Sequence, residues 1–518
     1  MDDSLTKDIQ EPPDTSDRTV SGGNIALAVG LILTVIVVLA LRFHVLPLGI
    51  PGEWEWLYRE VPVRMGFGTL LALMTCLLAA ALVAWLLNRQ TLERYQTRLA
   101  LAVMVLACWV SVSGLLVDRP AAPVEVPAVS TSVTSMGYYS FAKATPELWR
   151  AFSYFSGHPQ SEHGLPTPPG RVATHPPGPF LFFYYGRALL QAWPAPARWL
   201  QAALLNRWGL TDDILYSVAR FYAMPNIGPN DMIPAAVLAL VVTFLGCLLP
   251  LPAYLLGREL MGREAGLVTA LVAATIPSLL AFSPSIDGVA AVLACLTMAL
   301  AVRALRRGQW LACILAGVAL SAGVLWTAGL GVIVVAMIVL AAVMQLKLAR
   351  EEGRLSPALA LLAVFGTAGL LLLALKFAVG YDVLGNLRLI SINQRNEMLG
   401  RRQYTGWLPM NLYDFALFMG PFAAALVAAA YLRLREVSAL WGYGLGVAAM
   451  LLMVVLSGST RGEVGRIWLF MMPLFGVLAA AMLVSVNKRD RTMAILLTVI
   501  CQFGLGFTIS SCLALVNP

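Results

Sequence analysis

The chain has 518 residues, of which 59% are hydrophobic and 12% charged, and its mean hydropathy is +0.76. Soluble globular chains usually carry about 25% charged residues. The composition therefore excludes an ordinary soluble protein and indicates a polytopic membrane protein. The formal net charge of +8 (36 Lys and Arg against 28 Asp and Glu) does not indicate nucleic-acid binding, because the basic residues lie in short loops between apolar runs.

Residues 1–20 are polar and acidic, and they lack the basic start and small-residue cleavage site of a secretory signal. We expect residues 1–23 to form a disordered cytoplasmic tail, followed by a single transmembrane domain over residues 24–518. An uncleaved first membrane helix fits a bacterial inner membrane.

Long apolar runs follow one another along the rest of the chain. Runs of about 17–25 apolar residues predict membrane helices. We therefore expect an all-α polytopic membrane protein with about 13 transmembrane helices, near residues 24–46, 65–87, 98–117, 233–256, 265–282, 286–302, 310–327, 329–346, 357–379, 411–431, 439–456, 467–486 and 492–515.

The basic residues predict the orientation of these helices, since cytoplasmic loops are enriched in Lys and Arg. Basic clusters occur near residues 89–98, 303–307, 347–354, 433–435 and 488–491. If they are cytoplasmic, the N-terminus is cytoplasmic too, and the exterior loops are 47–64, 118–176, 283–288, 380–410 and 457–466. We expect short helices in this periplasmic loop region. Because the loop 118–176 and the start of the helix at 233 are both predicted to be exterior, residues 177–231 must begin and end on that face. They would do so either through two weakly apolar spans or as a re-entrant or interfacial segment.

The first exterior loop carries an acidic pair, Glu53 and Glu55, on either side of Trp54. Such a pair is suited to holding a divalent cation through oxygen ligands or to supplying a general base. The alternative is a pair of solvated carboxylates within an interfacial aromatic belt.

All four histidines lie on the predicted exterior or at its boundary: His44, His158, His163 and His175. His158 and His163 are weak candidates for a metal site, and the seven cysteines lack metal-ligand spacing. In the run His175-Pro176-Pro177 the prolines restrict the backbone, which would hold His175 at the water–membrane boundary. Packing of His175 against the following helix is the alternative.

Further charged residues lie on the same predicted face. Asp287 stands at the outer end of an apolar helix, where an acid is costly and a functional role is the default hypothesis. The exterior arginines run against the positive-inside bias and predict an anionic ligand, because guanidinium binds phosphate bidentately. Binding of phospholipid headgroups is the alternative. These arginines and their polar neighbours are Arg401, Arg402, Tyr404, Arg461, Glu463 and Arg466.

Together these motifs resemble a polyprenyl-phosphate-dependent glycosyltransferase of the GT-C superfamily, close to its protein O-mannosyltransferase and aminoarabinose transferase branch. Glu53 and Glu55 match the acidic pair of that family, and His175-Pro176-Pro177 matches its His-Pro-Pro element. Weaker matches are a short cytoplasmic turn at 257–266, an S-P-x-x-D turn at 283–287 and a late arginine-rich element at 461–466. The order of the motifs covers residues 45 to 475.

One feature departs from the family. Two predicted membrane helices, 65–87 and 98–117, separate the acidic pair from the His-Pro-Pro element, whereas the family places both in one loop. Either the pair folds back to the site, or Glu147, Asp118 or Asp287 supplies the base, or the chain lacks the activity.

The resemblance implies transfer of a sugar from a polyprenyl phosphate to an acceptor hydroxyl, on a glycan, lipid or protein, at the extracytoplasmic face. Glu53 or Glu55 would act as the base. Arginines would stabilise the departing lipid phosphate: Arg461, Arg466 and one of Arg401 and Arg402. Other residues would hold the sugar or the acceptor: His175 and Asp287 by polar contacts, and Tyr138, Tyr139 and Trp407 by stacking. No cofactor is required, although Mg²⁺ or Mn²⁺ is compatible with the acidic pair.

Two other classes remain as alternatives: a transporter or flippase of lipids or glycans, and a non-catalytic membrane protein of envelope assembly. Transporters often show inverted repeats and charges near the middle of the membrane. This sequence shows no convincing internal repeat, and its unusual charges gather at one predicted face, which favours the transferase.

Overall fold

The computed structural model describes residues 16–89, 92–132, 135–157, 170–195, 198–199, 201–203, 211–221, 226–347, 355–396, 400–433 and 438–515. The N-terminal half contains α1 (Ser16–Arg42), β1 (Gly49–Ile50), β2 (Trp54–Glu55), α2 (Phe67–Leu87), α3 (Arg94–Val117), α4 (Ala122–Thr131), α5 (Tyr138–Ala144), α6 (Leu148–Phe155), α7 (Gly170–Ala173), α8 (Gly178–Ala192), α10 (Asp212–Phe221), α11 (Pro229–Gly246) and α12 (Pro250–Met261).

The C-terminal half is mainly helical in its described residues. It contains α13 (Arg263–Ala274), α14 (Pro277–Ala281), α15 (Asp287–Arg307), α16 (Trp310–Trp326), the 3₁₀ helix η3 (Ala328–Val332), α17 (Ile333–Lys347), α18 (Pro357–Val379), α19 (Val383–Gln394), α20 (Tyr404–Met419), α21 (Pro421–Arg433), α22 (Ser438–Ser457), α23 (Val464–Ile467), α24 (Met472–Ser485) and α25 (Lys488–Cys512).

The fold is the predicted all-α polytopic one, but the number of spans differs from the predicted 13. Within the described residues, ten helices are long and apolar enough to cross a membrane. An eleventh span would be the pair α20 and α21, which is bent by 109°. The remaining two predicted spans coincide with α16 and α24, which have 17 and 14 residues. Since a helix rises about 1.5 Å per residue, 14 residues cover only about 21 Å of a hydrocarbon core about 30 Å thick.

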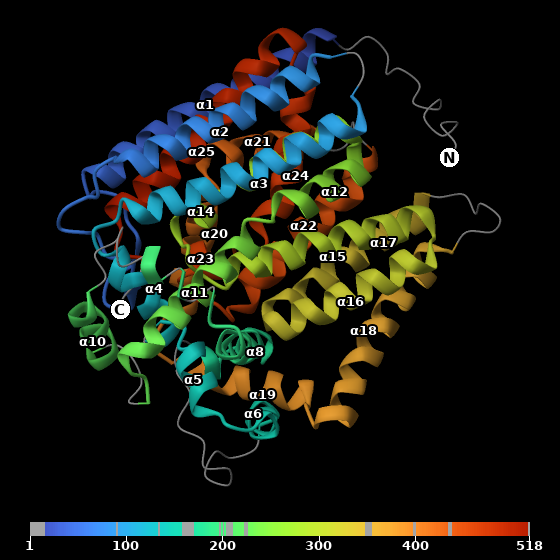
Figure 1. Cartoon of the computed structure of the whole chain (residues 1–518). Helices are drawn as coiled ribbons and strands as arrows, with labels where there is room; N and C mark the ends of the chain where they lie inside the picture. Colours follow the sequence, from blue (N-terminus) through green and yellow to red (C-terminus); the bar gives the residue numbers. More distant parts are fainter. Residues whose placement is uncertain are drawn as a thin grey trace.

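The long helices run alongside one another, and the start of α1 and the end of α25 lie at opposite ends of the bundle (Figure 1). Short helices α4, α5, α6, α8, α10 and α19 gather at the end where α25 ends. A second hydrophobic core holds this layer together, with Tyr138, Phe141 and Phe180 fully buried in it. The predicted region of short helices is therefore present.

Residues 177–231 remain at this end of the bundle in their described parts. They include α8, which has 15 residues, and α10, which has 10, and neither qualifies as a span. Figure 1 shows α8 end-on, so that it crosses the direction of the long helices. An interfacial segment is therefore the alternative that best fits the described residues.

The predicted cytoplasmic loops meet at the opposite end of the bundle. Asn88 after α2 donates to Thr492 of α25 over 3.2 Å. Arg491 of α25 lies 3.6 Å from the carboxylate of Glu264 at the start of α13. A buried carboxylate at the end of α12 binds the arginines of α12 and α15 at 2.9–3.5 Å: Glu259 with Arg258, Arg303 and Arg307. The described parts of the basic clusters near 89–98, 303–307 and 488–491 therefore lie toward one end, as the sequence predicted.

A buried ion network ties the other end together. Glu125 of α4 lies 3.2 Å from Arg59 and 3.5 Å from Arg119. Arg119 also donates to the Ala281 carbonyl (2.7 Å) and to Ser510 of α25 (3.0 Å). Arg119 and Glu125 are only 2% and 4% exposed, so each charge depends on its partner.

Replacing Glu125 by Gln should destabilise the protein by about 3–5 kcal/mol, because the Arg119 charge stays buried without its carboxylate. The measurement is the apparent melting temperature of the purified chain in detergent. The control is Glu147→Gln, which removes an exposed pair with Arg150 and should cost at most about 1 kcal/mol. Equal melting temperatures for the two variants would contradict the role given to Glu125.

Candidate active site

The acidic pair lies on a short antiparallel hairpin formed by β1 and β2. Residues two positions apart in a strand point to the same side, but Glu53 lies in the turn just before β2. The two glutamates therefore have different surroundings. The Oε2 atom of Glu53 accepts hydrogen bonds from the Gln403 backbone amide (2.9 Å) and from Trp407 Nε1 (2.7 Å), so Glu53 caps the start of α20. Glu55 is exposed and lines a cavity. Of the pair, Glu55 therefore lines a cavity and Glu53 does not, although two long helices separate both from the His-Pro-Pro element in sequence.

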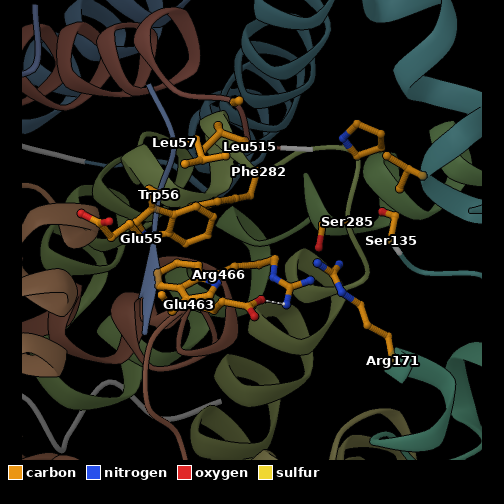
Figure 2. A pocket seen from close by; sticks show the side chains of 14 residues that line it. Glu55, Trp56, Leu57, Ser135, Arg171, Phe282, Ser285, Glu463, Arg466 and Leu515 are labelled. Carbon is orange, nitrogen blue, oxygen red and sulfur yellow. Dashed lines mark hydrogen bonds and ion pairs between the residues drawn. The ribbon is translucent and has the colours of Figure 1, made fainter. Parts of the chain in front are cut away.

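This first cavity has a volume of about 160 Å³. Aromatic and aliphatic side chains form one side, among them Trp54, Trp56 and Phe282. The other side is polar and consists of Ser135, Arg171, Ser285, Glu463 and Arg466 (Figure 2). In Figure 2 the Glu55 carboxylate lies across Trp56 from the two guanidinium groups. The cavity thus has a charged wall and a separate acidic rim.

A second cavity of about 300 Å³ adjoins it. Its walls come from η3, α19 and α22 and from the residues around α23. Apolar side chains supply the larger share of its lining surface: Val332, Leu387, Ile390, Met453, Val454, Ile467, Trp468 and Phe470. Besides the common charged residues, its polar lining consists of Thr174, His175, Thr327, Ser391, Gln394, Ser457, Ser459 and Thr460. A long apolar group would fit this cavity better than a charged one.

Arg171, Glu463 and Arg466 line both cavities and so form their common wall. Arg466 Nη2 donates to Glu463 Oε2 over 2.5 Å. Glu463 has a positive φ of 57°, a left-handed conformation that is uncommon for a residue with a side chain. No hydrogen bond or ion pair engages the Arg171 guanidinium within the described parts of the chain. Two cations therefore face one place; Arg466 forms ion pairs there, whereas Asp287 attracts Arg171 without pairing with it.

Asp287 supports this wall from the first turn of α15. Its Oδ2 atom accepts a hydrogen bond from Ser285 Oγ (2.5 Å), and its backbone amide donates to the same Oγ (3.1 Å). Arg466 Nε lies 3.9 Å from Oδ2, which is too far for a hydrogen bond but close enough for electrostatic attraction. Asp287 thus helps to fix Arg466 in place.

His175 is connected to Arg171 through the backbone. His175 Nδ1 lies 2.8 Å from the Arg171 carbonyl oxygen. A carbonyl only accepts, so Nδ1 carries the proton. Burial lowers the pKa of His175 to about 4, although the bond to Arg171 opposes this shift. The ring is therefore neutral near pH 7, and Nε2 is left as an acceptor.

Other predicted site residues form a structural brace beside the first cavity. Arg402 and Arg461 each donate to the backbone carbonyl of the other, and the Arg402 guanidinium lies 5.5 Å from the Trp54 ring. Tyr404 OH donates to the Leu456 carbonyl over 2.6 Å. Arg401 is exposed at the surface. Of the four predicted exterior arginines, Arg466 is the one that lines the cavities.

The predicted tyrosines are packed into the layer of short helices. Tyr138 is fully buried and stacks on Phe183, with ring centroids 6.0 Å apart. Its hydroxyl donates to the Arg171 carbonyl over 3.5 Å. Tyr139 is also buried, and its hydroxyl donates to Asp231 over 3.4 Å. Neither ring lines the two cavities.

The alternative bases have defined surroundings as well. Asp118 accepts backbone hydrogen bonds from Gly66, Gly68 and Thr69 at the start of α2 (2.7–3.2 Å). Glu147 bonds Trp149 and Arg150 at the surface. Of these alternatives, Asp287 lies nearest to the common wall.

His158 and His163 lie outside the described residues. In the parts of the chain that the structure describes, no group of three or more His, Cys, Asp or Glu side chains is placed to hold a metal ion. Glu53 accepts its two hydrogen bonds, from the Gln403 amide and from Trp407, at the same oxygen, Oε2.

Arg171, Ser135 and Ser285 are site residues that the sequence analysis did not select. Arg171 carried the same signal as the selected arginines, since it lies in a predicted exterior loop. The serines gave no signal, because a lone hydroxyl in a loop has many roles. Chain packing alone brings them together with α23.

The fold and cavities define a multi-pass helical membrane protein with a charged site at one end of its bundle. Residues 230–370 match the family model described as dolichyl-phosphate-mannose-protein mannosyltransferase. This match confirms the predicted resemblance to the GT-C superfamily over a segment that contains Asp287 and the wall residues of η3.

Two further comparisons concern the whole chain. A structure of the Archaeoglobus fulgidus oligosaccharyltransferase is similar at 12% identity and a TM-score of 0.40, over 85% of this chain and 55% of that one. The chain thus spans about half the length of that protein. No curated protein sequence matches significantly.

The lowered pKa of His175 predicts a pH effect on stability. In the unfolded chain His175 has a pKa near its ordinary 6.5, so between about pH 4 and pH 6.5 the unfolded state binds more protons than the folded state. Stability from this group is complete above pH 6.5 and falls as the pH drops through that window. Melting curves at pH 7.5 and 5.0 should show a smaller loss for His175→Asn than for the wild type. An equal loss would contradict a neutral, buried His175.

Proposed function

We propose that the protein is a membrane glycosyltransferase that moves a sugar from a polyprenyl phosphate to an acceptor hydroxyl at the extracytoplasmic face. The observation that carries the proposal is the common wall, where Arg171 and Arg466 face both an apolar cavity and a smaller polar one. A lipid-linked sugar phosphate has the matching order of parts: an apolar tail, an anionic phosphate and a polar ring.

In this proposal the isoprenoid enters the second cavity between η3, α19 and α22. Its phosphate lies at Arg171 and Arg466, since guanidinium groups bind phosphate oxygens through paired, charge-assisted hydrogen bonds. Arg171 is attracted by Asp287 but makes no ion pair in the described parts of the chain, so a phosphate would give it a direct anionic partner. The sugar then extends into the first cavity beside Ser135, where Trp54 and Trp56 offer apolar surface.

The reaction follows from these positions. The acceptor oxygen attacks the anomeric carbon, and the bond from that carbon to the phosphate oxygen breaks. Its electron pair stays on the phosphate, whose growing charge the two arginines stabilise. The acceptor proton passes to Glu55, the member of the acidic pair that lines the cavity. Asp287 and His175 act as positioning residues, through Arg466 and through the backbone of Arg171.

The charges at the two ends of the bundle support the proposed orientation. By the positive-inside rule we propose that the end with the arginines around Glu259 is cytoplasmic and the cavity end extracytoplasmic, in an inner membrane. The acceptor would then be a glycan, lipid or protein of the cell envelope. A lipid flippase is the second candidate, and it would need charged groups along a path between the two faces.

Removal of the Arg171 side chain should lower kcat/KM for sugar transfer about 10²- to 10³-fold, as expected when one donor to a developing oxyanion is lost. The assay uses radiolabelled polyprenyl-phosphate sugars with membrane extracts as the acceptor source. Arg171→Ala is the primary variant, because this guanidinium makes no ion pair whose loss would disturb folding. Arg466→Lys keeps the charge but loses the bidentate geometry and should also be impaired.

The matched control is Arg401→Ala, an exposed arginine outside both cavities, which should keep wild-type activity. Full activity in both Arg171→Ala and Arg466→Lys would remove the phosphate clamp from the mechanism. Movement of labelled lipid across vesicles without any transfer would favour the flippase instead.

The acidic pair offers a second test, because its members differ in surroundings. Glu55→Gln should lower kcat about 10²- to 10⁴-fold, the range for loss of general-base catalysis. Glu53→Gln keeps an oxygen that can accept the hydrogen bonds at the start of α20 but loses the negative charge there. It should therefore lower the melting temperature and leave kcat close to the wild-type value. Full activity in Glu55→Gln with lost activity in Asp287→Asn would transfer the role of base to Asp287.

A further inference from the structure

A membrane-facing groove lies between α3 and the kinked span formed by α11 and α12, away from the two cavities. Its volume is about 480 Å³, and its lining includes Leu101, Val105, Trp109, Phe244 and Leu251. Trp109 and Phe244 meet edge to face at 5.4 Å and form its inner end. The groove is apolar except for one residue, Arg98.

Arg98 lies at the end of the groove where the basic loops gather. Two contacts give the relative direction of α3 and the α11–α12 span. Arg263, just after α12, donates to the Leu92 carbonyl before α3 over 3.2 Å, whereas Trp109, later in α3, contacts Phe244, earlier in the span. The two therefore run antiparallel. Arg98, in the second turn of α3, is therefore at the Arg263 end, where the membrane boundary is expected.

The charge of Arg98 is not balanced within the protein. Its side chain is exposed, and no ion pair or hydrogen bond to it occurs in the part of the chain that the structure describes. Arg258 of α12 lies about two helical turns beyond Leu251 on the same face, but it already pairs with Glu259 at 3.2 Å. The groove thus ends at an unpaired cation next to a basic cluster.

We propose that this groove binds an anionic phospholipid of the leaflet on the basic side, with an acyl chain along Leu101, Val105 and Leu251 and the phosphate at Arg98. Charge complementarity selects this occupant, since basic pockets between membrane helices at the cytoplasmic side bind anionic headgroups. A zwitterionic lipid would fill the same apolar space but would carry a compensating cation beside Arg98. This site is independent of the glycosyltransferase activity.

The test is native mass spectrometry of the full chain in detergent, titrated with phosphatidylglycerol or with phosphatidylcholine. The wild type should bind phosphatidylglycerol about tenfold more tightly, the size expected for one charge-assisted hydrogen bond. Arg98→Gln should abolish this preference. Ala102→Trp, which fills the groove from an exposed position of α3, should weaken binding of both lipids.

Arg489→Gln is the control, because it removes an exposed arginine from the same end but outside the groove. It should keep the preference. Equal binding of the two lipids by the wild type would overturn the proposal, as would an equal loss in Arg489→Gln and Arg98→Gln, which would indicate a diffuse basic surface. Unchanged binding in Ala102→Trp would overturn the placement of the acyl chain. Melting temperatures of all variants confirm that they are folded.

Discussion

The attraction between Glu125 and its two arginines decides how the cavity end of this protein is built. Arg119 reaches from the end of α3 to α14 and α25, and Arg59 joins the segment after the hairpin to the Leu513 carbonyl. In this way three parts of the chain that are remote in sequence are drawn together over a single carboxylate. The first cavity lies among those parts, because Trp54, Phe282 and Leu515 all line it. The network acts together with backbone hydrogen bonds between residues 57–63 and 511–514 and with the Glu53 contacts to α20, which also attach the hairpin to the bundle.

The common wall adds a second constraint, which is a balance of charge. Arg466 is held by Glu463 and attracted by Asp287, so that its own charge is largely compensated. Arg171 is positioned by the contacts of its backbone carbonyl with His175 and Tyr138, and Asp287 attracts its side chain without forming an ion pair with it. The common wall thus combines one paired cation with one that has no ion pair among the described residues.

Much of the fold could be predicted from the sequence, because each membrane helix is encoded in a local apolar run. Each of the 13 predicted runs contains a helix, and the described parts of the basic clusters near 89–98, 303–307 and 488–491 lie toward one end. The count of spans was less predictable, since apolar runs do not reveal that α24 is short or that the chain bends by 109° between α20 and α21.

The site was only partly predictable, for a physical reason. Whether Glu53 or Glu55 faces a cavity depends on a contact with Trp407, 354 positions away in the chain. In the same way, Arg402 and Arg461 bind each other's backbone carbonyls, a contact that no sequence pattern indicates. Such pairings arise from tertiary packing, and residue type alone does not distinguish a brace from a binding group.

The shortness of α24 has a consequence for water. Most of its 14 residues are buried, and a helix of about 21 Å that ends at the basic boundary begins well inside a hydrocarbon core of about 30 Å. The turn that carries Arg466 lies before that inner end, in α23, and residues 468–471 separate the two. In the proposed reaction, a wall that begins at this depth would limit the access of bulk water to an activated sugar and so favour transfer over hydrolysis.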